Sequence, residues 1–286
     1  SYVFSALAAS IDGEFNFIEQ DNNGTGILEV SLDARFLIND GQHRKAAIMA
    51  ALEENSSLEN ETISVVFYED QGLARSQQMF TDLNKHALKT SNSLAELYDS
   101  RDRLAVATRK VIAEIAFLDT YVDKEKDNLG KYSASLFTLN IFYTANKKIL
   151  RRKECDENFE RFLQEFWSLV VEYMIPWKEM ESKELSKKEL REQYVASQAV
   201  VIQAFGRVGG FLFEHREYAL ETYLPGITHI NWKRSAEEWK RRVIRSNGRM
   251  INNAEAIILA GNVIKESMGL PLTEDEQRAE QTHLQH

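Results

Sequence analysis

The sequence predicts an α+β fold, in which a small α+β domain over residues 1–92 is followed by an all-helical domain over residues 93–286. Segments rich in β-branched and aromatic residues occur only before about residue 90, whereas apolar stripes with the helical period dominate after residue 93. The chain has 286 residues, of which 43% are apolar and 28% charged. This length is sufficient for two domains, and the composition is that of an ordinary globular protein.

The α+β domain is predicted to contain several strands and two helices. The Asp12-Gly13 pair is a hairpin signal that joins the first strand to a return strand carrying Phe15 and Phe17. One helix begins near Lys45, and a second covers residues 72–87. The predicted strands comprise residues 2–11, 15–17, 27–30, 34–39 and 63–68, and the apolar stripe of the first helix consists of Ala47, Ile48, Ala51 and Leu52.

The second domain is predicted to be helical because capping signals and apolar stripes alternate along it. Capping boxes occur at residues 93–96 and 186–189, Pro176 ends a helix, and Ser235 begins another. The last helix covers residues 253–268, and the polar residues beyond Glu274 predict a disordered tail. The principal stripes are Leu104, Thr108, Val111, Ile112 and Ile115, and then Phe159, Phe162, Leu163, Phe166, Val170 and Met174.

Charge and cysteine content limit the possible functions. The net charge of −9 argues against a surface that coats DNA generally, so any nucleic-acid contact requires a local basic patch. The single cysteine, Cys155, excludes an internal disulfide, fits a reducing cytoplasm and is predicted to be a surface residue. Neither a membrane-spanning apolar run nor a signal peptide is visible, so a cytoplasmic location is expected. The abrupt start in strand-like sequence predicts that an N-terminal segment of the domain is missing.

The string Asp40-Gly41-Gln42-His43-Arg44 is the first candidate site. It lies between a predicted strand and a predicted helix, where backbone N–H groups and the helix dipole favour an anion. Gly41 would let the backbone approach a phosphate, which His43 and Arg44 would contact. Asp40 would cap the helix or hold a ribose or a metal. The structural alternative is that Asp40 is an N-cap, Gly41 supplies a positive φ, and Arg44 pairs with a local acid.

Asn84 and Lys85 form a second candidate, near the end of the predicted helix 72–87. In a compact domain they would face the same pocket as His43 and Arg44 and supply further phosphate ligands. The alternative is a solvated helix end whose basic side chains complement the helix dipole. No metal site is predicted, because the histidines lack metal-binding spacing and Cys155 has no cysteine partner. No nucleophile elbow or Walker A string is present either.

A third candidate is the basic segment, residues 231–249. It contains seven basic residues against two acidic ones, a net charge of +5, with Trp232 and Trp239 interleaved. A helix carrying this cluster would bind the DNA backbone with an affinity that falls steeply with salt. The alternative is a solvated basic face that docks on the acidic remainder of the protein. The basic residues are Lys233, Arg234, Lys240, Arg241, Arg242, Arg245 and Arg249.

Residues 36–48, which include the string at residues 40–44, resemble the signature of DGQHR-domain proteins. Residues 1–13 and 75–87 resemble the DndB family of DNA sulfur modification proteins, and the resemblance covers nearly the whole chain. That family is bacterial and is linked to phosphorothioation, in which sulfur replaces an oxygen of the DNA backbone phosphate. The resemblance implies a DNA-binding transcriptional regulator of the modification genes, whose partner is promoter double-stranded DNA.

The string is also similar, more remotely, to the ParB and sulfiredoxin superfamily, which implies a ParB/sulfiredoxin-like α+β domain. Gly41, Arg44 and Ala47 match the ParB strand–turn–helix that binds nucleotide phosphates. Gln42 stands where sulfiredoxin has its reactive cysteine, so that chemistry is excluded. Asn84 matches a ParB asparagine, but the arginine that follows it in ParB has no counterpart. The resemblance therefore implies binding of ATP or another nucleotide more than its hydrolysis.

Three hypotheses follow. The first is a DndB-like regulator that binds phosphate or nucleotide through the residue 40–44 string, Asn84 and Lys85, and DNA through the basic segment. The second is a nucleoside-triphosphate hydrolase in which Asp40 or His43 positions water or a metal ion. The third is a scaffold, possible also as a homo-oligomer, that binds the phosphorothioation enzymes through its acidic helical surface.

Overall fold

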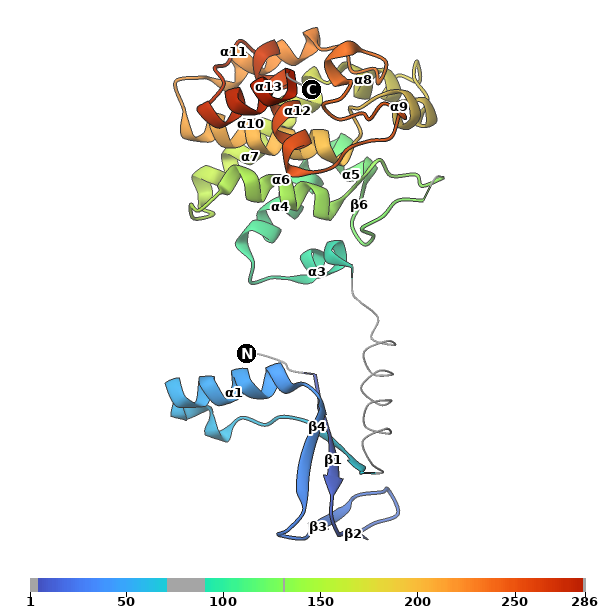
Figure 1. The fold of residues 1–286 in the computed structure, drawn as a ribbon, viewed down its shortest axis with the longest axis vertical. Coiled ribbons are helices and arrows are strands. Elements are labelled where there is room, and N and C mark those ends of the chain that lie inside the picture. Colours follow the sequence, from blue (N-terminus) through green and yellow to red (C-terminus); the bar gives the residue numbers. More distant parts are fainter. Residues whose placement is uncertain (1–4, 71–90, 131, 285–286) are drawn as a thin grey trace. The chain divides into compact units, whose positions relative to one another are not determined.

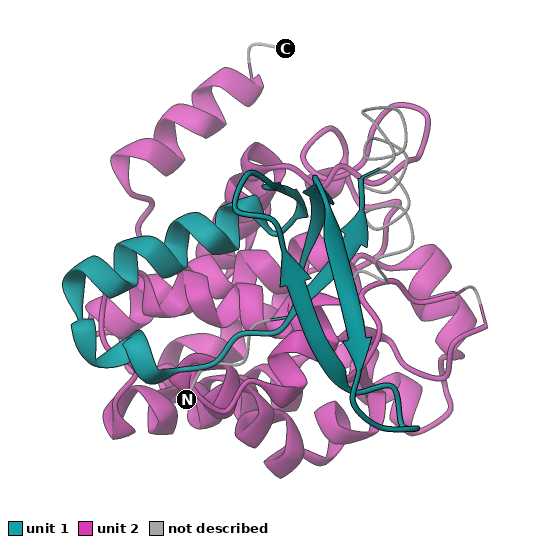
Figure 2. Ribbon diagram, turned by 90° about the horizontal axis from the view of Figure 1, so that it is seen from below, with its two compact units in different colours: residues 1–89 teal, residues 90–286 magenta. Residues whose placement is uncertain are grey.

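The computed structural model describes residues 5–70, 91–130 and 132–284. The chain divides into two compact units, residues 1–89 and 90–286 (Figures 1 and 2), and each is described by itself. The predicted α+β class is confirmed, since strands concentrate in the first unit and helices in the second. The predicted helix 72–87, with Asn84 and Lys85, lies outside the described residues.

The first unit contains a three-stranded sheet with β1 (Leu7–Asp12) at its centre. β4 (Arg35–Asp40) pairs with β1 in antiparallel orientation, and β5 (Val65–Glu69) pairs with it in parallel orientation. Residues 7–11 of β1 are buried, because this strand has a neighbour on each side. The small side chains of Ala8 and Ala9 suit this central position.

The predicted hairpin between the first two strands is wrong. β2 (Phe15–Glu19) pairs with β3 (Gly26–Val30), in a register that places Phe17 opposite Leu28. Both edges of β1 are already taken by β4 and β5, so no edge remains for β2. Gly13, with φ of 144°, directs the chain out of β1 into this separate two-stranded sheet.

α1 (Gln42–Glu54) begins at Gln42 and not near Lys45. Gly41 adopts the left-handed conformation, with φ of 96°, and turns the chain from β4 directly into the helix. The apolar stripe is only partly covered: Ile48, Ala51 and Leu52 are half-buried, and α1 has no fully buried residue. η1 (Ser56–Asn60) then leads towards β5.

The second unit is built around α10 (Ala199–Glu214), which packs against α6 (Leu139–Leu150) and α12 (Ala254–Ser267). Glycines let the backbones of α10 and α6 approach closely: a Cβ on Gly206 would lie 2.5 Å from the carbonyl oxygen of Ala145. The remaining helices are α3 (Asn92–Tyr98), α4 (Arg103–Glu114), α5 (Ala116–Tyr121), α7 (Glu157–Tyr173), α8 (Ile175–Glu181), α9 (Lys187–Gln193), α11 (Leu220–Tyr223), η2 (Leu224–His229), η3 (Glu237–Trp239) and α13 (Glu274–Leu284). The two-residue strands β6 (Val122–Asp123) and β7 (Phe137–Thr138) pair in parallel.

The stripes predicted in this unit are confirmed as its core, and one of its two capping boxes is confirmed. All six predicted apolar residues of the α7 stripe are buried, and Ser186 and Glu189 form a reciprocal capping box at α9. The predicted cap at Ser93 is wrong, because Ser91 caps α3. Ser93 is buried instead, where its hydroxyl donates to the carbonyl of Lys126. Among the described residues, no helix has both the length and the apolar composition of a membrane span.

Cys155 is buried and does not lie at the surface as predicted. Its thiol lies 3.6 Å from the carbonyl oxygen of Arg103, and only 7% of the residue is exposed. Burial raises the pKa of this thiol to about 11, and the nearby carboxylate of Glu160 adds to the effect. Since the thiolate is the reactive form, this cysteine is a packing residue near neutral pH.

The tail beyond Glu274, predicted to be disordered, forms helix α13. Thr273 and Glu276 cap it reciprocally: the amide of Thr273 donates to the Glu276 carboxylate at 2.9 Å, and the amide of Glu276 donates to the Thr273 hydroxyl. Glu276 also forms a buried ion pair with Lys265 of α12, with an N–O distance of 2.7 Å. This pairing fixes a helix whose remaining surface is mainly polar.

Candidate nucleic-acid interface

Arg44 of the residue 40–44 string is engaged within the first unit. Its guanidinium donates to the Asp40 carboxylate at 2.6 Å and to the carbonyl oxygens of Ser5 and Ala6 at 2.8 and 3.1 Å. It also donates to the hydroxyl of Ser5. Two parts of the structural alternative are confirmed, since Gly41 has a positive φ and Arg44 pairs with a local acid, Asp40. The third part is wrong, because Asp40 does not cap α1. These bonds join the start of α1 to the start of β1.

The other residues of the string differ in which of their groups remain accessible to a ligand. The side-chain amide of Gln42 donates to the carbonyl of Ile38 at 3.3 Å, and His43 is exposed. The N-cap, Gly41, offers no side chain, and no side-chain cap satisfies the first-turn amides of α1 within the described residues. A Cβ at Gly41 would also lie 2.3 Å from a methyl group of Leu7. The groups available to an anion here are the first-turn amides and the His43 ring.

The basic segment is not the predicted helix. Only the short turn η3 is helical, and Arg241, with φ of 64°, interrupts any continuation. Trp239, Val243 and Ile244 are buried, so this part of the chain is shaped by its anchors in the core. Trp232 is buried as well and stacks on Trp239 with ring centroids 5.5 Å apart. The tryptophans between the basic residues therefore belong to the core.

Several cations of the basic segment have protein partners. The guanidinium of Arg234 donates to the carbonyls of Arg191 and Tyr194 at 3.0 and 3.4 Å. Lys240 pairs with Glu237 at 2.5 Å. Arg242 pairs with Glu280 of α13. The alternative interpretation, in which the basic face docks on acidic parts of the protein, is therefore correct for Arg242.

Residues 245–249 form a tight turn, here called the arginine turn. The amide of Arg245 donates to the carbonyl of Arg249 at 2.9 Å, and the amide of Gly248 donates to the carbonyl of Arg245 at 2.8 Å. Outside this turn, the amide of Ile251 donates to the carbonyl of Val243 at 2.8 Å. Arg245 and Arg249 are exposed, and neither side chain has a hydrogen bond or ion pair within the described part of the chain. The turn thus presents two guanidinium groups on an anchored backbone.

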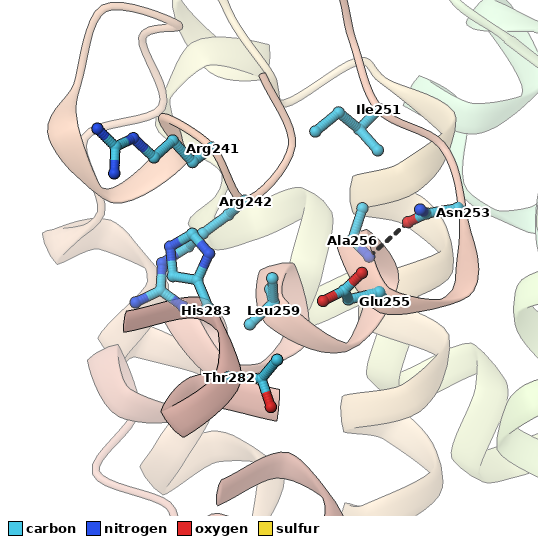
Figure 3. A pocket seen from close by; sticks show the side chains of 9 residues that line it. All are labelled: Arg241, Arg242, Ile251, Asn253, Glu255, Ala256, Leu259, Thr282 and His283. Carbon is cyan, nitrogen blue, oxygen red and sulfur yellow. Dashed lines mark hydrogen bonds between the residues drawn. The ribbon is translucent and has the colours of Figure 1, made fainter. Parts of the chain in front are cut away.

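Lys233 is likewise exposed, and so is Arg241, which is not without an interaction partner. Residues of α13 complete this region: Glu280 pairs with Arg242, and His283 lies beside the two arginines (Figure 3). These α13 residues were not predicted as part of a site, because the polar tail was expected to be disordered. The capping signal Thr273–Glu276 would have revealed the helix. No group of His, Cys, Asp and Glu suited to a metal ion occurs in the described ranges.

These observations define a class: an α+β protein with a separate helical unit that carries an exposed cationic turn. The family model described as DndB, DNA-sulfur modification-associated, matches residues 1–271. The chain therefore belongs to the DndB family, which confirms the resemblance seen in the sequence and places the protein in DNA sulfur modification. No curated protein and no solved structure gives a significant match to the chain.

Proposed function

We propose that this protein is a DNA-binding transcriptional regulator of the DNA phosphorothioation genes. The observation that carries the proposal is the arginine turn, in which Arg245 and Arg249 are exposed and without ion-pair partners among the described residues. Family membership supplies the context, because the matching family is associated with DNA sulfur modification.

The chemistry of the turn suits the DNA backbone. Guanidinium groups form bidentate, charge-assisted hydrogen bonds with phosphate oxygens. The overall charge of −9 disfavours DNA binding by the surface as a whole, so a local cationic element would also orient the protein on the duplex. Contacts of this kind position a protein on DNA, whereas base-edge contacts provide the sequence preference.

The test is fluorescence anisotropy with a duplex from the protein's own operon promoter beside a scrambled duplex of equal length, across a salt series. We expect tighter binding to the promoter at moderate salt, and a log–log salt slope of roughly −2 to −4 for two to four phosphate contacts. Equally weak binding to both duplexes would contradict the proposal. Tight and equal binding to both duplexes would support contacts with the DNA backbone but contradict a role in regulating one promoter.

A second candidate function is nucleotide binding at the residue 40–44 string. It is supported by the uncapped first turn of α1, a helix of 13 residues, which follows the left-handed Gly41 and contains the exposed His43. Arg44 is already bonded to Asp40 and to the start of β1, so the amides and His43 would be the ligands.

For this second candidate, we expect His43→Ala to weaken ATP binding several-fold in calorimetry, because it removes a ring that can donate a hydrogen bond to a phosphate oxygen. Lys188→Gln, at an exposed position on α9, is the control and is expected to leave ATP binding unchanged. Equal ATP affinity in the His43 variant and the wild type would exclude a phosphate-binding role for His43. Absence of turnover with every triphosphate would exclude the hydrolase hypothesis.

A further inference from the structure

A small cavity lies beside the basic segment, between the start of α12 and the end of α13 (Figure 3). Its volume is about 230 Å³. Leu259 and Ile251 contribute apolar wall, and Arg241, Arg242 and His283 contribute groups that carry or accept positive charge. Typical small-molecule sites have about 300–1,000 Å³. The cavity therefore has room for a phosphate group and part of an attached sugar.

Charge is distributed unevenly around this cavity. Figure 3 shows Arg241, Arg242 and His283 on one side and Glu255 on the other. The cationic side is partly neutralised, because Arg242 pairs with Glu280. The first turn of the 14-residue helix α12 adds the positive end of a helix dipole, and Asn253 at its N-cap accepts the amide of Ala256 at 2.8 Å. A ligand with an anionic group at one end and hydrogen-bond donors at the other complements this arrangement.

We propose that the cavity binds the phosphate group of a nucleotide unit, with the phosphate against Arg241, Arg242 and His283 and a sugar hydroxyl donating to Glu255. The nucleotide unit is either part of a DNA strand or a free nucleotide, since both present the same chemistry. This inference rests on the proposed function, because Arg241 and Arg242 lie in the same basic segment as the arginine turn that is proposed to contact DNA.

His283 couples the binding of phosphate to pH. Burial lowers the pKa of its ring, the cations of Arg242 and Arg241 lower it further, and the carboxylates of Glu280 and Glu255 oppose them. A phosphate placed beside the ring adds negative charge and raises this pKa. Phosphate binding therefore takes up a proton, and the affinity increases as the pH falls. The increase is about tenfold at most for each unit by which binding raises the pKa.

The experiment is NMR titration of the full chain labelled with ¹³C on the histidine rings, in which His283→Gln assigns the His283 signal. The probes are the dinucleotide TpT, thymidine monophosphate and, as the uncharged control, thymidine. TpT keeps a constant charge near neutral pH, so its pH dependence reports the protein. We expect TpT or thymidine monophosphate to raise the pKa of His283 and thymidine to leave it unchanged.

Arg241→Gln is expected to weaken probe binding at least fivefold. Arg278→Gln is the matched control, because it removes an arginine from the exposed face of α13 outside the cavity. A response to TpT assigns the site to the DNA backbone, and a response to the monophosphate alone assigns it to free nucleotides. A His283 signal unmoved by both probes, or one that responds equally in Arg241→Gln, overturns the inference. Promoter binding that persists in that case would leave the proposed function standing.

Discussion

Replacement of Glu276 by glutamine is expected to detach helix α13 from the second unit. Lys265 and Glu276 have only 1% and 5% of their side chains exposed and lie 2.7 Å apart. The Lys265 ammonium also donates to the carbonyl of Pro271 at 3.3 Å and lies 3.7 Å from the ring centroid of Phe211. Removal of one charge leaves the other buried without a counter-ion, which costs about 3–5 kcal/mol. That cost opposes the docking of a short helix whose surface is mainly polar.

Hydrogen–deuterium exchange of residues 274–284 measures this effect. The amides of α13 are expected to lose their protection in Glu276→Gln, while α7 and α10 keep theirs. Glu274→Gln is the matched control, because Glu274 is exposed on the first turn of the same helix and contributes little. Lys265→Met combined with Glu276→Gln is expected to restore part of the protection, since no unpaired ammonium remains. Unchanged exchange in Glu276→Gln would contradict the assigned role of the pair.

The same pair makes the docking of α13 sensitive to acid. Burial raises the pKa of Glu276, but the hydrogen bonds from Lys265 and the Thr273 amide, together with the charges of Lys265 and Arg207, outweigh it. The folded-state pKa is therefore below the unfolded value of about 4.3. A depressed carboxylate pKa contributes stability above the unfolded value, and this contribution is lost as the pH falls through the folded-state pKa. Protection of α13 should decline below about pH 4 in the wild type.

Arg245→Gln combined with Arg249→Gln is expected to weaken DNA binding roughly 60-fold at 0.1 M salt. The estimate follows from counter-ion release, which contributes about eightfold per phosphate contact at that salt concentration. The loss should be similar for promoter and scrambled duplexes, because backbone contacts carry no sequence information. The log–log salt slope should become shallower by about 1.8.

The control for this variant is Lys147→Gln combined with Lys188→Gln, which removes the same charge at exposed positions on α6 and α9. Fluorescence anisotropy across the salt series compares the two double variants. If both weaken binding equally, only net charge matters and the arginine turn is not a contact surface. If the arginine variant reduces promoter affinity alone, the two side chains contact base edges instead of phosphates.

The local sequence pattern correctly predicted those helices whose stabilising residues lie within the helix itself. The α7 stripe has helical spacing and is buried, and the Ser186–Glu189 box closes within four residues. The same helical spacing gave a wrong prediction at residues 235–249, where a helix was expected. Trp239, Val243 and Ile244 have spacing compatible with a helix, but their backbone follows irregular turns around the core. Spacing reports which residues are buried, and it does not report which backbone conformation buries them.

The candidate site likewise contains features that the sequence predicts and features that only the folded chain reveals. The string at residues 40–44 could be identified from sequence, but the engagement of Arg44 could not, because its carbonyl partners lie at Ser5 and Ala6. Among the seven basic residues, composition gave no indication that Arg234 donates to the carbonyl of Arg191 or that Arg242 pairs with Glu280. His283 was missed because the helix that carries it is held by a buried ion pair and not by an apolar stripe.

The α+β class, the family and the location of the basic segment could all be predicted from the residues alone, because each depends on residue order over short distances. The folded chain was needed to show which cations are neutralised, that α13 docks, and that Arg241, Arg242 and His283 share a cavity. These features depend on pairs of side chains that are distant in the sequence. Lys265 and Glu276 are 11 residues apart, and Arg242 and Glu280 are 38 residues apart. Electrostatic and packing energies depend on distance in space, which only the folded chain defines.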